Sequence, residues 1–129
     1  MSGPYREPGV CRLCQPDTPD TLSHSYLHCQ NNVHAARYLL ACVQQVSPNT
    51  TYEDLLLLQL DVDQQYELPL VTIIAAALKT IWDYRTQNKP VYPYIVKAEI
   101  QSRSYILKKT KHYQGAGNIM DNLLLNIPT

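Results

Sequence analysis

The chain has 129 residues, 45% of them hydrophobic, with 11 basic and 11 acidic side chains that give a formal net charge of zero. This length and composition fit one globular domain and exclude a chain that is disordered throughout. The longest apolar run, residues 68–78, is too short to cross a bilayer, so we expect no membrane contact.

Four potential metal ligands lie close together near the N-terminus. With the spacing C-x2-C-x9-H-x4-C, they are Cys11, Cys14, His24 and Cys29. Three thiolates and one imidazole favour tetrahedral Zn2+, and a site with four protein ligands leaves no open position for a catalytic water. The spacing predicts a structural CCHC zinc knuckle over residues 10–30, after a disordered lead-in over residues 1–9. Cysteines in metal spacing also favour a reducing, intracellular compartment.

The second half of this ligand set has alternatives. His28 follows His24 by four residues and gives a two-histidine set, and Cys29 with His34 is a third option. The loop between the pairs is shorter than the roughly twelve residues of DNA-reading zinc fingers, which weakens the two-histidine set. A thiolate is also a softer zinc ligand than a second imidazole. We favour His24 with Cys29 and leave the other two sets open.

Hydrophobic periodicity and capping residues predict a helical domain over residues 31–126, with a tail over residues 127–129. The helices are expected at residues 22–29, 31–47, 50–60, 69–89, 94–113 and 118–126. Thr50 and Glu53 have capping-box spacing, Pro69 suits the first turn of a helix, and Gly115 and Gly117 suit helix ends. No alternating strand pattern is present. The predicted fold is mainly α, a small zinc knuckle followed by a bundle of about five helices.

The expected buried faces follow from the same periodicity. Residues 31–47 place one apolar stripe at Val33, Ala36, Leu40, Val43 and Val46. The long helix is expected to bury Ile73, Ala76, Ala77, Thr80 and Ile81. The helix at 94–113 has its stripe at Val96, Ile100, Arg103 or Ser104, and Leu107, and the last helix at Ile119, Leu123 and Leu124. Cys42, outside the knuckle, is expected to be a buried, unreactive thiol.

The neutral net charge hides an asymmetry. Residues 1–78 hold three basic and eight acidic side chains, whereas residues 79–111 hold eight basic and two acidic ones. This local excess would attract a polyanion, although a solvated helix end is an alternative interpretation of its last residues. The candidate nucleic-acid contacts are Arg85, Lys97, Arg103, Lys108, Lys109 and Lys111. We find no motif for a catalytic site and expect no enzyme activity from this chain.

The segment CRLCQPDTPDTLSHSYLHC resembles the zinc-binding segment that follows the polymerase domain in non-LTR (LINE-like) retrotransposon reverse transcriptases. The stretch Thr21-Leu22-Ser23-His24 and the following Cys29 match that family's pattern, which supports His24 and Cys29 as ligands. The likeness continues through Ile81-Trp82-Asp83-Tyr84-Arg85 and covers about residues 10–126.

The resemblance implies a non-catalytic region of an RNA-directed DNA polymerase. In that family the region is associated with holding template RNA or target DNA during target-primed reverse transcription, in the nucleus and cytoplasm. Its implied partners are RNA or DNA, bound nonspecifically, and the reverse transcriptase core of the same polypeptide. The alternative is a structural or protein-interaction module that packs on the polymerase domain or forms a homodimer.

Overall fold

Helices make up 73% of residues 24–128, the part of the chain that the computed structural model describes, and no strand occurs there. The predicted mainly α fold is therefore confirmed. In chain order the described elements are the π-helical turn η1 (His24–His28), α1 (Val33–Gln44), α2 (Tyr52–Leu57), α3 (Gln64–Thr86), α4 (Pro93–Lys108), the 3-10 turn η2 (Lys111–Tyr113) and α5 (Gln114–Leu125). The predicted lead-in, residues 1–9, lies outside the described residues.

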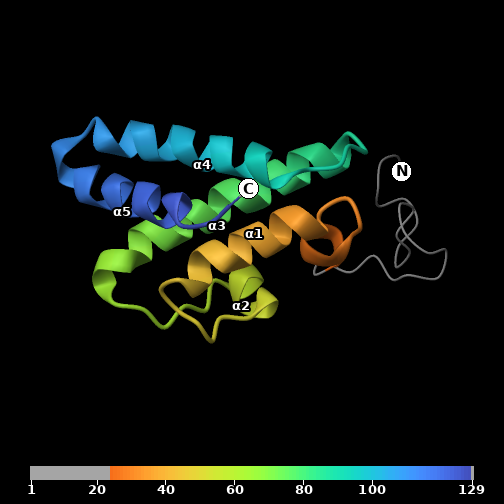
Figure 1. Ribbon diagram of the computed structural model, residues 1–129, viewed down its shortest axis with the longest axis horizontal. Helices are drawn as coiled ribbons and strands as arrows, with labels where there is room; N and C mark the ends of the chain where they lie inside the picture. The colour runs from red at the N-terminus through yellow and green to blue at the C-terminus, as the bar shows by residue number, and fades with distance from the viewer. Residues whose placement is uncertain (1–23, 129) are drawn as a thin grey trace.

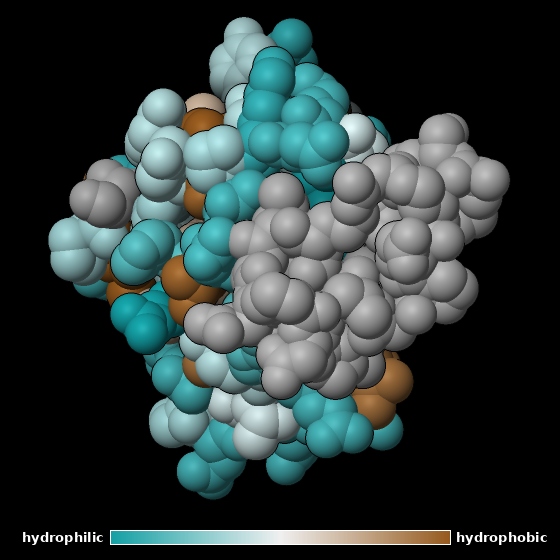
Figure 2. All heavy atoms as spheres, turned by 90° about the vertical axis from the view of Figure 1, so that its right-hand side faces the viewer, coloured by the Kyte–Doolittle hydropathy of each residue, from teal (hydrophilic) through white to brown (hydrophobic). Residues whose placement is uncertain are grey.

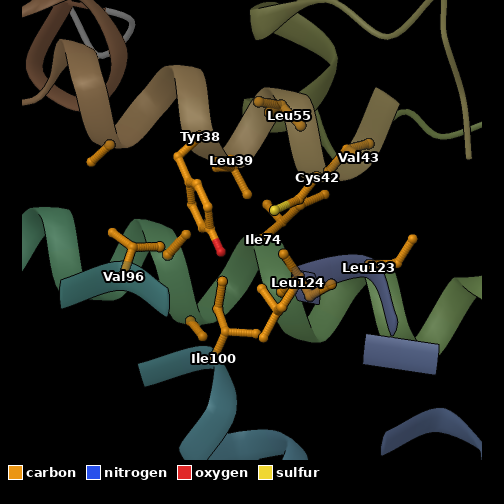
Figure 3. Packing of buried hydrophobic residues seen from close by; sticks show 14 of the residues in the cluster. Tyr38, Leu39, Cys42, Val43, Leu55, Ile74, Val96, Ile100, Leu123 and Leu124 are labelled. Carbon is orange, nitrogen blue, oxygen red and sulfur yellow. The ribbon is translucent and has the colours of Figure 1, made fainter. Parts of the chain in front are cut away.

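The last three helices form the body of the domain. α4 and α5 run antiparallel beside each other, joined by η2, and α3 packs against both (Figure 1). α1 packs on α3 and α4, and η1 packs on α1 and α3. The core between them is built from aliphatic side chains, and the buried ring of Tyr38 extends from α1 toward α3 and α4 (Figure 3).

The long helix α3 begins earlier than predicted. Residues 64–67, which precede the predicted helix, form its first turn, where Glu67 is favoured by the helix dipole. Pro69 therefore lies inside the helix. Its missing N–H costs only the hydrogen bond to the carbonyl of Gln65, an exposed residue that water can solvate. The predicted buried face is confirmed at every position, Ile73, Ala76, Ala77, Thr80 and Ile81.

The capping box of α2 lies one residue later than predicted. The N–H of Asp54 donates to Thr51 Oγ1 at 3.2 Å, and the N–H of Thr51 donates to Asp54 Oδ2 at 2.9 Å. Thr50 is buried instead, and its carbonyl accepts from Gln44 Nε2 at 2.9 Å. Thr50 and Glu53 are therefore not the cap, because the chain turns Thr50 toward α1.

The predicted apolar stripe of α1 is confirmed at Ala36 and Val43 but not at its other three positions. Its buried residues are Ala35, Ala36, Tyr38, Leu39, Cys42 and Val43. Val33, Leu40 and Val46 are only partly buried. The buried face is wider than one stripe because α1 contacts η1 as well as α3 and α4.

Gly115 and Gly117 are not helix ends, because both lie inside α5. Gly115 has open space where a Cβ would be, whereas a Cβ on Gly117 would lie 2.9 Å from the Ser104 carbonyl oxygen of α4. Gly117 therefore permits the close approach of α4 and α5. Of the predicted α4 stripe, Val96, Ile100 and Ser104 are buried, which decides for Ser104 over Arg103.

Candidate metal centre and nucleic-acid interface

Two of the predicted zinc ligands lie at the two ends of η1. The N–H of Cys29 donates to the carbonyl oxygen of His24 at 2.8 Å, which is the i→i+5 hydrogen bond of a π-helical turn. In an α-helix, which turns about 100° per residue, side chains five residues apart would diverge by about 140°. The wider π turn reduces this divergence and brings His24 and Cys29 toward the same side of the turn.

The donor atoms of this pair suit a soft metal ion. Cys29 is buried, and so is the Nε2 atom of His24. A sulfur and an imidazole nitrogen held on one turn fit two positions of a tetrahedral zinc site. Cys11 and Cys14 lie outside the described residues. Within residues 24–128 no group of three or more potential metal ligands occurs.

The alternative histidines lie elsewhere. His28 is exposed, and its ring contacts Tyr52 of α2 edge-on, with ring centroids 5.2 Å apart and planes at 75°. His34 is exposed on α1. Both of these residues are exposed, whereas His24 is partly buried.

The η1 turn is fixed to the helical body by its middle residues. The ring of Tyr26 stacks on Trp82 of α3, with centroids 5.6 Å apart and an interplanar angle of 26°. Leu27 is fully buried, and the N–H of Val91 donates to the Asn31 carbonyl at 3.0 Å. The described surface visible at this end of the molecule is mainly hydrophilic (Figure 2). Tyr26 and Leu27 therefore hold η1 against the helical body.

Two of the predicted nucleic-acid contacts are not available as expected. Arg85 is only 2% exposed, so its side chain has no surface to offer a phosphate, and we leave it out of the interface. The periodicity of α3 explains this, because Arg85 follows Ile81 by four residues on the buried face. Arg103 lies on the flank of α4 beside Glu99, with Nε 3.2 Å from the carboxylate oxygen Oε1. Its charge is therefore locally compensated.

The remaining predicted contacts follow α4 along its length and just beyond its C-terminal end. Lys97 and Lys108 line a groove of about 420 Å³ between α4 and α5. The other lining residues of this groove are Gln101, Tyr105, Asp121, Leu124 and Leu125. Lys109 and Lys111 are exposed just beyond the end of α4, and the Nζ of Lys109 lies 4.6 Å from the ring centroid of Tyr105. Four of the six predicted basic residues thus lie in one extended region, along α4 and the turn that follows it.

Asp121 is the carboxylate in this region. Its Oδ2 pairs with the Lys108 ammonium, and its Oδ1 lies 2.6 Å from Ser104 Oγ. The Ser104 hydroxyl also lies 2.8 Å from the Gly117 carbonyl, so its single proton is shared between two acceptors. Burial alone would raise the pKa of Asp121, but the hydrogen bonds from Lys108 and Ser104 and the charge of Lys108 together lower it below its usual value. The carboxylate is therefore a stable anion at neutral pH.

Sequence reasoning missed part of this region. Gln101, Leu124 and Leu125 line the groove, but none was a candidate site residue. The spacing of three and four residues between the outward-facing residues from Tyr94 to Lys108 could have predicted the wall of the groove that α4 forms. The opposite wall depends on how α5 docks, which periodicity alone does not give.

Comparison of the chain with protein-family models, curated proteins and solved structures finds no significant match. None of the described helices combines the length and apolarity needed to span a bilayer.

Proposed function

We propose that this chain is the zinc-binding region that follows the polymerase domain of a non-LTR retrotransposon reverse transcriptase. In this proposal it binds template RNA or target DNA nonspecifically, and it is not itself an enzyme. Zn2+ would be held by Cys11, Cys14, His24 and Cys29 and would fold the N-terminal knuckle against α1 and α3. The arrangement of His24 and Cys29 on one π-helical turn supports this ligand set.

The observation that carries the nucleic-acid proposal is the series of four lysines along α4 and the start of η2, two of which line the α4–α5 groove. Lys97 lies near the start of α4, Lys108 is its last residue, and Lys109 and Lys111 follow just beyond it. Asp121 pairs with Lys108 and leaves the other three ammonium groups to form a positive region. Such a region attracts phosphates without reading sequence, which is the behaviour expected of a polymerase-associated domain.

Salt dependence tests this proposal with a labelled 20-nucleotide RNA and fluorescence anisotropy. If the three lysines that Asp121 leaves unpaired contact phosphates, the slope of log K against log salt should be about −2.1 for a single strand. Affinity should then fall about 18-fold between 50 and 200 mM salt. The double substitution Lys109→Gln and Lys111→Gln should reduce the slope by about 1.4.

Lys79→Gln is the matched control, because Lys79 pairs with Asp83 at 2.8 Å on α3. It should leave both affinity and slope unchanged. Absence of RNA and DNA binding at low salt would refute the nucleic-acid proposal. Equal losses from Lys79→Gln and from the double substitution would refute the assignment to this region.

A specific observation also favours the rival function, a protein-interaction module. Leu68 and Val71 are exposed one turn apart on α3, and Leu57 and Leu58 are exposed at the end of α2. Apolar side chains left in water at helical spacing suit packing on the polymerase core or on a second copy. Light scattering that shows a dimer disrupted by Leu68→Glu but not by Gln65→Glu, with no RNA affinity, would favour this function.

A further inference from the structure

One side of α4 carries aromatic and basic residues in a regular row. Its members, which we call the α4 row, are Tyr94, Lys97, Gln101, Tyr105 and Lys108. Successive members are three or four residues apart, so they share one face of the helix. The buried stripe of Val96, Ile100 and Ser104 occupies another face. The same helix therefore contributes to the core and presents the row outward.

The aromatic rings of this row are placed in solvent. Tyr94 is 63% exposed and Tyr105 is 60% exposed, although burying such rings would stabilise the fold. The ring of Tyr94 stacks nearly parallel on that of Tyr92, with centroids 6.2 Å apart and planes at 6°. Lys109 Nζ lies over one face of the Tyr105 ring, but much of the surface of that ring stays exposed. Both rings offer flat surfaces on which a further ring can stack.

The groove beside the row is better suited to bases than to phosphates. Its wall on α5 has the apolar side chains Leu124 and Leu125, the latter 78% exposed. The carboxylate of Asp121 also lines the groove and would repel a phosphate. Lys97 lines the groove, and Lys109 lies over the ring of Tyr105, another lining residue. An occupant with flat apolar rings and an anionic backbone is complementary to this arrangement.

We infer that the α4 row binds single-stranded nucleic acid, with bases stacked on Tyr94 and Tyr105 and phosphates held by the surrounding lysines. The inference rests on the proposed function and adds the strand state and the stacking residues. In a duplex the faces of the bases are stacked on one another, so its phosphates would contact the lysines but its bases would not stack on either tyrosine. The two tyrosines are about 16 Å apart along the helix axis, which accommodates roughly five bases stacked at about 3.4 Å.

The test uses the full 129-residue chain with three labelled probes of one sequence: a 12-nucleotide RNA, the same DNA strand, and its 12-base-pair DNA duplex. Both single strands should bind more tightly than the duplex. Tyr105→Ala should weaken single-strand binding about tenfold or more and change duplex binding little. Tyr105→Phe should retain single-strand affinity, because the ring that stacks is kept.

Ile106→Ala is the matched control, since Ile106 is exposed on α4 next to Tyr105 but outside the row. Circular dichroism verifies that each variant stays folded, and Tyr94→Ala provides a second, independent loss. Lysine-dependent binding that prefers the duplex, or that ignores both alanine substitutions, would overturn the inference and leave the proposed function standing. Failure to bind any probe would overturn both. If single-strand binding depends on the tyrosines and one of the two single strands binds more tightly, the inference is supported, and the tighter strand identifies RNA or DNA as the preferred ligand.

Discussion

The contact of α4 with α5 at Gly117 predicts opposite effects for two glycine-to-alanine substitutions in one helix. Inside a helix, alanine is favoured over glycine by about 0.8–1 kcal/mol. At Gly115 no atom lies within 4 Å of the new Cβ, so no steric cost opposes this gain. At Gly117 the new Cβ would overlap Lys108 Cγ and lie 2.9 Å from the Ser104 carbonyl oxygen. The lysine side chain can rotate away, but the backbone oxygen moves only if the helices separate.

The separation has a cost that exceeds the gain in helix propensity. Overpacking in a tight contact costs about 1–3 kcal/mol, and weakening the 2.8 Å hydrogen bond from Ser104 Oγ to the Gly117 carbonyl adds about 1 kcal/mol. Gly117→Ala should therefore lower the free energy of unfolding by about 1–3 kcal/mol. Gly115→Ala should raise it by about 0.5 kcal/mol, less than the full propensity gain because Gly115 is in the first turn of α5.

Urea unfolding measures both changes. Circular dichroism reports the helices and the fluorescence of Trp82 reports α3, and coincident transitions verify two-state behaviour. A Gly117→Ala variant as stable as the parent chain, or stabilised as much as Gly115→Ala, would refute the close approach of the two helices.

At the proposed metal site, Cys29→Ser should lower zinc affinity by more than about 100-fold, because changes in residues that only support a ligand already cost about 10–100-fold. His28→Ala should leave zinc affinity unchanged, because His28 is exposed and is not a proposed ligand. Equal losses of affinity in a zinc titration of the two variants would contradict the ligand choice. The lowered pKa of Asp121 means that its carboxylate stabilises the folded state above about pH 4 and that this contribution is lost as pH falls through the folded-state pKa. Asp121→Asn should therefore make the urea midpoint less sensitive to acid, and an unchanged pH dependence would exclude this role. Burial raises the pKa of Cys42 to about 11, against smaller opposing effects of Tyr38 and Lys97, so at pH 8 its thiolate fraction is about 100-fold below that of a thiol with a pKa of 9.0. Mass spectrometry should find Cys42 labelled by a thiol reagent in urea but not in the native chain, and rapid native labelling would contradict its burial.

The existence and inner faces of the long helices were predictable because burial imposes a helical period on the sequence. Ile73 and Ile81 of α3, and Val96 and Ile100 of α4, are buried as their spacing indicated. The ends of helices were less predictable, because they depend on local exceptions. Pro69, for example, is tolerated inside α3 because the carbonyl of Gln65, which loses its hydrogen bond, can be solvated by water.

The basic residues illustrate a different limit. Composition gives the number of positive charges between residues 79 and 111, but their directions depend on where each helix begins and how it docks. Arg85 turns inward, Arg103 lies beside Glu99, and Lys97 opens onto the groove. The second wall of that groove comes from α5. Its first turn was not predicted, because Gly115 and Gly117 were interpreted as helix ends. The direction in which each charged side chain points could therefore be determined only from the packed structure.

The α4–α5 contact connects the stability of the domain with its proposed binding surface. Ser104 and Gly117 set the distance between the helices, and Lys108 and Asp121 form the ion pair in the groove next to them. Separating the helices by Gly117→Ala would widen the groove as well as lower stability, so it should weaken single-strand binding under conditions in which the variant remains fully folded. Gly115→Ala leaves the contact intact and should leave binding unchanged. A stability loss at Gly117 without any change in affinity would mean that the groove does not hold the bases.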